Sequence, residues 1–284
     1  MERKNAWETY DKSQEKKVMK LAEQYRQFIS AGKTERECVR LTEKMAREAG
    51  YISLEEALTS GDTLKPGDKV YAIHKKKLAV LFQIGTEPLE KGMNILGAHI
   101  DSPRLDLKQN PLYEDGEMAL LDTHYYGGIK KYQWAAIPLA LHGVVARKDG
   151  TVVELAIGED PSDPVLGISD LLIHLSGEQL QKKAAVVVEG ENLNIIVGSK
   201  PLKSKKDKEK KELILKALLE ILKEKYEIEE EDFLSADLAY AETLTLFFCK
   251  FMILSFCIHK LILPVRWGFD QLRNVIFLLK FSED

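Results

Sequence analysis

The feature that most constrains this chain is the stretch 94–103 (NILGAHIDSP), in which an apolar strand leads into a His-x-Asp pair and ends at a proline. Because strand side chains alternate between two faces, His99 and Asp101 project to the same side. A neutral imidazole binds zinc through one ring nitrogen and needs the other held by a carboxylate or carbonyl. The stretch therefore predicts a metal ligand, His99, with Asp101 as its acidic helper. The alternative is a hydrogen-bonded structural histidine at a strand end.

Two further blocks follow in the chain, HYYGGI at 124–129 and ISDLLIHL at 168–175. Together with GAHIDSP at 97–103 they resemble the aspartyl aminopeptidase family of zinc metallopeptidases, over about residues 5–238. Several blocks in one order are more specific than a single motif. They also count against another His-x-Asp hydrolase, such as a carboxypeptidase or a deacylase.

The resemblance implies an α/β fold: a partial three-layer α/β/α zinc-peptidase catalytic core with an inserted, mainly β, assembly domain. We expect the first part of the catalytic domain at 1–105, the inserted oligomerisation domain at 106–232 and a truncated or divergent hydrophobic tail at 233–284. The family releases N-terminal Asp or Glu from peptides, uses two zinc ions per subunit and forms homo-oligomers. On the same resemblance His174 is a substrate-binding residue that a neighbouring subunit contributes; its own apolar surroundings favour a structural histidine.

The resemblance ends after Leu238. The family continues there with an Asp that bridges two zinc ions, a Glu pair, a further Asp and a final His, and 239–284 contains none of these motifs. Three or more protein ligands per zinc are usual. We therefore expect a truncated or frame-altered zinc aminopeptidase of poor activity. The alternative is a non-catalytic oligomerisation module derived from such a peptidase.

The tail contains an apolar run at 244–265, LTLFFCKFMILSFCIHKLILPV, close to the length of a membrane span. Lys250, His259 and Lys260 interrupt it, and a charge at the centre of a span costs about 2.5 to 3.5 kcal/mol on insertion scales. A membrane contact is therefore not expected, and a membrane-tethered fragment remains a third hypothesis.

Charge and cysteine content exclude other classes. The net charge is −4, which gives no reason to expect a nucleic-acid partner. The lysine-rich segment 199–212 lacks aromatic stacking residues, so we interpret it as a solvated loop rather than a nucleic-acid arm. Three cysteines without Cys-x-x-Cys spacing indicate a reducing cytoplasm, and the charged N-terminus is not that of an export signal.

Periodicity predicts the local structure. Helices are expected at 11–30, from a Thr34–Glu37 capping box to Gly50, and at 213–226. Cys38 lies on the apolar face of the second helix and is expected to be a buried thiol. Strands are expected at 69–74, 78–84, 93–99, 104–108, 139–147, 152–157 and 184–189.

Overall fold

The computed structural model describes residues 4–61, 63–200, 213–242 and 275–280. It divides into two compact units, the first from Met1–Asp101 with Thr245–Asp284 and the second from Ser102–Leu244. The run 244–265, its two cysteines and most of the lysine-rich segment lie outside the described residues. No helix in the described part of the chain is long and apolar enough to cross a membrane.

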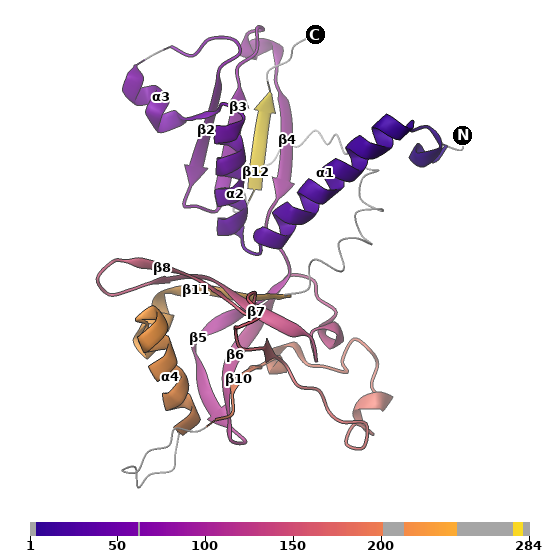
Figure 1. The fold of residues 1–284 in the computed structure, drawn as a ribbon, viewed down its shortest axis with the longest axis vertical. Helices are drawn as coiled ribbons and strands as arrows, with labels where there is room; N and C mark the ends of the chain where they lie inside the picture. Colours follow the sequence, from indigo (N-terminus) through magenta and orange to yellow (C-terminus); the bar gives the residue numbers. More distant parts are fainter. Residues whose placement is uncertain (1–3, 62, 201–212, 243–274, 281–284) are drawn as a thin grey trace. The chain divides into compact units, whose positions relative to one another are not determined.

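The first unit contains a mixed sheet with helices packed against it (Figure 1). Its helices are α1 (Lys12–Ala31), α2 (Glu35–Glu48) and α3 (Leu54–Ser60). Its strands are β1 (Ile52–Ser53), β2 (Lys69–His74), β3 (Leu78–Gln83), β4 (Asn94–His99) and β12 (Val275–Lys280). Thr34 and Glu37 form the predicted reciprocal cap of α2, and Gly50 follows it with φ of +85°. Both capping predictions are confirmed.

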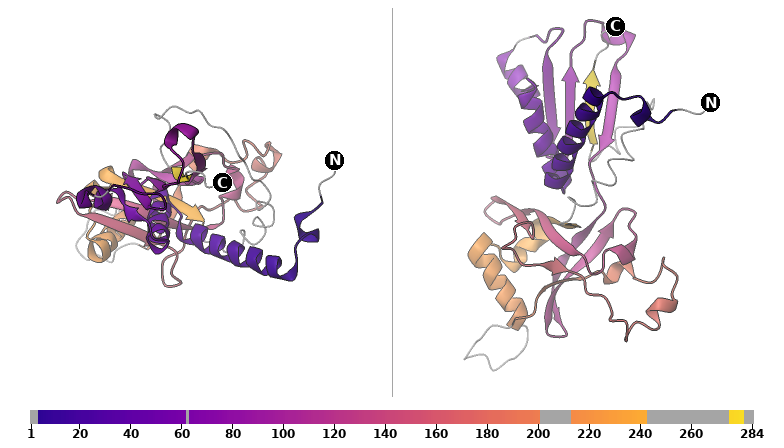
Figure 2. Two further views of the ribbon diagram at one scale, coloured as in Figure 1. Left: turned by 90° about the horizontal axis from the view of Figure 1, so that it is seen from above. Right: turned by 45° about the vertical axis from the view of Figure 1, so that its right-hand side comes forward.

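The strands of the first unit run in the order β1-β2-β3-β12-β4. β1 pairs parallel with β2 and β12 pairs parallel with β3, whereas β2–β3 and β12–β4 are antiparallel. α2 packs on β2 and β3, and α1 packs on α2, so that both helices lie on the same face (Figure 2). β4 is the last strand of this order, at the opposite edge from β1.

The second unit is a mainly β structure whose sheet closes on itself. Its strands are β5 (Arg104–Asp115), β6 (Met118–Tyr126), β7 (Pro138–Ala146), β8 (Val152–Ile157), β9 (Leu166–Gly167), β10 (Ile195–Gly198) and β11 (Ala236–Glu242). Their order is β11-β5-β6-β10-β9-β7-β8, and β11 also pairs antiparallel with β7, which closes the ring. Helix α4 (Leu213–Tyr226) packs on β5, β6 and β10 and confirms the predicted helix.

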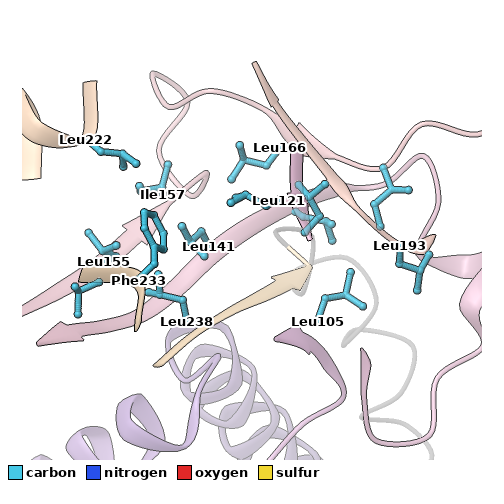
Figure 3. Packing of buried hydrophobic residues seen from close by; sticks show 14 of the residues in the cluster. Leu105, Leu121, Leu141, Leu155, Ile157, Leu166, Leu193, Leu222, Phe233 and Leu238 are labelled. Atoms are coloured by element: carbon cyan, nitrogen blue, oxygen red, sulfur yellow. The ribbon is translucent and has the colours of Figure 1, made fainter. Parts of the chain in front are cut away.

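A cluster of leucines and isoleucines fills the second unit (Figure 3). Its most deeply buried members include Leu105, Leu193 and Ile195, none of which is measurably exposed. Burying one such side chain contributes about 1.5 to 3 kcal/mol. Strands from both ends of the unit, β5 and β11, contribute to the cluster through Leu105 and Leu238. The cluster therefore binds the two ends of this unit together.

The mixed α/β class is confirmed, and one predicted strand is wrong. Residues 184–189 form turns and bends rather than a strand. Their AAVVVE sequence has strand propensity, but none of the described strands pairs with it. Strand propensity reflects packing against neighbours, so an apolar run without a partner does not become a strand.

Candidate metal-binding site

His99 is the last residue of β4, as the sequence predicts. The strand ends there, residues 100–103 have no regular structure, and Pro103 has no backbone N–H to donate to a ladder. Sites in α/β proteins gather at strand ends, where side chains are held by the sheet and still face solvent. His99 is held in this way.

Asp101 contacts the Nδ1 of the His99 ring through two of its oxygen atoms. The Nδ1 atom of His99 lies 3.1 Å from the backbone oxygen of Asp101 and 3.4 Å from its Oδ1. The shorter contact suits an Nδ1–H donating to the carbonyl, which leaves Nε2 as the unprotonated nitrogen. The histidine side chain is 82% exposed and that of the aspartate 27%. The ring is therefore oriented by its neighbour and open to a ligand from solution.

His99 with its partner Asp101 fits one coordination position of a zinc site. A carbonyl or carboxylate that fixes the tautomer of a ligating histidine is the usual partner of such a ligand. Among the residues that the structure describes, no group of three or more His, Cys, Asp or Glu side chains could hold a metal ion. His99 with Asp101 therefore supplies one ligand, and a tight zinc site requires at least two more.

His174 lies in the second unit, in a turn at 173–175. Its side chain is exposed, and so are its large apolar neighbours Leu172 (70%), Ile173 (67%) and Leu175 (69%). The apolar run around His174 is thus not a core segment. The expectation of a structural histidine, which depended on burial in that run, is not supported by this exposure.

Two other histidines have carboxylate partners in the second unit. His142 is 5% exposed, and its Nε2 lies 3.1 Å from Glu159. His124 is exposed, and its Nδ1 lies 2.8 Å from Glu191. Each of these two rings is therefore held by a carboxylate of its own unit.

Sequence reasoning did not find the charge network around Glu191. The Nζ atom of Lys108 lies 3.0 Å from Oδ1 of Asp122 and 3.4 Å from Oε2 of Glu191. The hydrogen bond with His124, followed by that from Lys108, lowers the pKa of the Glu191 carboxyl. The pairing of Leu107 with Thr123 brings Lys108 and Asp122 to neighbouring positions, but the sequence contains no signal for the third member, 67 residues beyond His124.

This chain is similar to proteins of a known family. The sequence profile described as Aminopeptidase I zinc metalloprotease (M18) matches residues 28–246. A probable M18 family aminopeptidase 1 of Clostridium acetobutylicum is 58% identical over 84% of this chain and 50% of its own length. Its counterpart in Thermotoga maritima is 43% identical, again over 84% of this chain and 50% of that protein. The chain thus spans about half the length of the curated relatives it matches.

Solved structures agree with the sequence match. The crystal structure of an M18 family aminopeptidase from Thermotoga maritima has a TM-score of 0.76 at 34% identity and covers 99% of this chain and 61% of that one. The crystal structure of aminopeptidase I from Clostridium acetobutylicum has a TM-score of 0.75 at 43% identity and covers 62% of that chain. The resemblance drawn from the sequence blocks is confirmed, and the chain belongs to the M18 family of aminopeptidase I zinc metalloproteases.

Proposed function

We propose that this chain carries the first part of the active centre of a zinc aminopeptidase, with His99 as a zinc ligand and Asp101 as the residue that orients it. The observation that carries the proposal is the contact between the His99 Nδ1 and Asp101, which leaves the opposite ring nitrogen facing solvent. Family membership supports the reaction class, aminopeptidase hydrolysis.

Zinc, when bound in such a centre, polarises the scissile carbonyl and lowers the pKa of a bound water. The role of this chain's residues is positional. His99 would bind zinc through its Nε2 atom, while Asp101 fixes the tautomer and the orientation of the ring. Because one imidazole cannot hold zinc tightly, we expect weak zinc binding and poor peptidase activity from this chain alone. The proposal includes two zinc ions per subunit and peptide substrates with N-terminal Asp or Glu.

We place His174 in the substrate pocket of a neighbouring subunit of a homo-oligomer. Its exposure in a turn, among exposed leucines, supports a role outside its own core. A cytoplasmic location is part of the same proposal, and the free thiol of Cys38 agrees with it.

A second candidate function is a non-catalytic oligomerisation module. The specific observation that favours it is that the second unit has an extensive leucine-rich core and also exposes Leu172, Ile173 and Leu175. Exposed apolar side chains in a cluster are typical of protein interfaces. In this case the unit assembles while the first unit remains inert.

Zinc titration of the full chain separates the two candidates. Calorimetry on the unaltered protein, on His99→Ala and on the matched control His74→Ala measures whether His99 contributes to binding; His74 is an exposed histidine at the end of β2. The enzyme proposal expects zinc binding that His99→Ala abolishes and His74→Ala preserves, together with slow release of Asp from an Asp-peptide.

Absence of zinc binding, with oligomers retained in light scattering, supports the module instead. Equal zinc binding by both histidine variants would remove His99 from the proposal. Partition of the protein into detergent would favour the membrane-tethered alternative.

A further inference from the structure

The segment that carries His174, residues 169–189, leaves the sheet of the second unit after β9 and returns to it at a short 3-10 helix, η5 (Gly190–Asn192) (Figure 1). The hydrogen bonds that the structure describes within this segment join near neighbours, as from Leu180 N to Ser176 O. None of the described strands pairs with it. Segments with so few fixed contacts have low local stability. The position of His174 therefore depends on how the two ends of the segment are held.

Strand pairing holds the first end of this segment. Gly167 of β9, two residues before it, pairs with Pro138 of β7 and with Ile196 of β10. The second end runs into residues 190–194, which precede the ladder between β10 and β6, because that ladder begins at Ile195. Contacts other than this ladder must therefore hold the second end.

Three successive residues of β6 hold the second end. The backbone N–H of Thr123 donates to Asn194 Oδ1 at 3.2 Å, and its hydroxyl donates to the backbone oxygen of Leu193 at 2.7 Å. The Nδ1 atom of the next residue, His124, lies 2.8 Å from Glu191 Oε1. Thr123 is fully buried, whereas the side chains of His124 and Glu191 are 61% and 55% exposed. Because an exposed ion pair contributes little to stability, this pair alone does not fix the segment.

Tyr125, the third of these residues, packs against Gly190. A β-carbon at Gly190 would lie 2.3 Å from Cε1 and 2.4 Å from Cδ1 of the tyrosine ring, closer than two such atoms can approach. His124 stacks on this ring with the centroids 5.3 Å apart, and the Nζ atom of Lys131 lies 4.9 Å from its centroid. Gly190 is buried, and its φ is not positive. Position 190 is therefore glycine because of the space available, not because of its backbone conformation.

We propose that His124 and Tyr125 are positioning residues, which anchor residues 190–194 on β6 and so hold the segment 169–189 with His174 in place. The close contact between Tyr125 and Gly190 is the main part of this anchor, because the ion pair of His124 is exposed. The inference rests on the substrate-pocket role proposed for His174. It also gives a role to part of the HYYGGI block, which the zinc site does not use.

Hydrogen exchange of the full chain, measured peptide by peptide with mass spectrometry, tests this anchor. Gly190→Ala should accelerate exchange in 169–189 about tenfold or more, because the added methyl group displaces either the Tyr125 ring or the backbone at 190. Exchange in β7 and β8 should not change. Gly128→Ala is the matched control, since a β-carbon there has no atom within 4 Å and its φ is not positive.

Variants of Tyr125 show whether its ring carries the effect. Tyr125→Phe keeps the ring and should exchange like the native chain, whereas Tyr125→Ala should accelerate exchange in 169–189. In the Tyr125→Ala background, Gly190→Ala should add little, because the ring atoms with which its methyl group collides are gone. The comparison of Tyr125→Phe with Tyr125→Ala also decides the question if Gly190→Ala alone does not fold.

A signal from His174 connects the anchor with the segment that it holds. The imidazole resonance of His174, identified by its loss in His174→Ala, should shift in Gly190→Ala and stay in place in Gly128→Ala. The inference is overturned if Gly190→Ala and Gly128→Ala exchange alike, if Gly190→Ala accelerates exchange throughout the second unit, or if Tyr125→Phe behaves like Tyr125→Ala. Failure of the pocket role is a separate result: His174→Ala would then leave hydrolysis of an Asp-peptide by the oligomer unchanged, while the exchange results would stand.

Discussion

The backbone oxygen of Asp237 lies so close to Gly143 that a β-carbon at this position would overlap it. Gly143 belongs to β7 and faces Leu238 of β11 in the pairing that closes the ring of the second unit. Its φ of +142° is a conformation that other residues rarely adopt. The closure of the sheet therefore depends on a position without a side chain.

Replacing Gly143 by alanine should destabilise the protein strongly. The new methyl group collides with backbone, which cannot move aside as a side chain can, and the backbone angle is itself unfavourable. Overpacking costs about 1–3 kcal/mol and such strain a similar amount, so we expect a loss of about 3 kcal/mol or more in the free energy of unfolding. Urea denaturation measures it. Gly128→Ala is the matched control, since nothing lies within 4 Å of its added β-carbon; equal losses in both variants would contradict the argument.

The thiol of Cys38 should be inert in the folded protein. Burial, with the nearby charges of Glu37 and Glu35 as smaller causes, raises the pKa of this thiol to about 12. The thiolate is the reactive form, so iodoacetamide at pH 8 should leave Cys38 unmodified in the native chain and modify it in urea. Peptide mass spectrometry identifies the modified cysteine. Native modification at the denatured rate would show that this helix face opens readily.

Local signals were sufficient for much of the first unit. The Thr34–Glu37 box, the helix that follows it and the strands β2 and β3 depend on residues close together in sequence, and all were predicted. The placement of His99 at the end of β4 followed in the same way, from an apolar run ending in a polar pair. The proximity of Asp101 then follows from the short chain between the two residues.

Long-range pairings were not predictable. Nothing in residues 275–280 indicates that they form β12 between β3 and β4, and nothing in 236–242 indicates the pairing of β11 with β7. The error at 184–189 has the same origin, because strand formation there depended on a partner that propensity does not supply. The exposure of His174 likewise depends on which neighbours the fold brings near it.

Glu191 should make the stability of the second unit depend on pH on the acid side. The hydrogen bond with His124 is the first cause of its lowered pKa. The contribution of Glu191 to the free energy of unfolding is therefore present above its pKa in the unfolded state, about 4.3. The contribution is lost as the pH falls through the folded value. The difference in melting temperature between the native protein and Glu191→Gln should therefore shrink from pH 6 to about pH 3. The effect is small because the group is exposed to solvent and salt. A difference that does not change with pH would contradict it.

Tyr71 should make stability depend on pH at the alkaline end, through its contact with α2. Its hydroxyl donates to Glu43 Oε1 at 2.8 Å, and burial, followed by this bond, raises its pKa to about 12. The neutral phenol is favoured in the folded state, so its stabilisation is complete below the unfolded pKa of about 10 and lost as the pH rises toward 12. Tyr71→Phe should cost about 1 kcal/mol at neutral pH and remove that alkaline loss.

Absorbance at 295 nm follows the ionisation that this prediction concerns. The native chain has 10 tyrosines. Its absorbance titration should show a late phase near pH 12 that the titration of Tyr71→Phe lacks. Tyr132→Phe, at a 41% exposed position, should retain that phase because Tyr71 and Glu43 are untouched. If Tyr71→Phe keeps the late phase, another tyrosine is responsible. If the late phase disappears but the alkaline loss of stability is unchanged, the link between β2 and α2 does not depend on the protonated phenol, and packing alone holds this helix to the sheet.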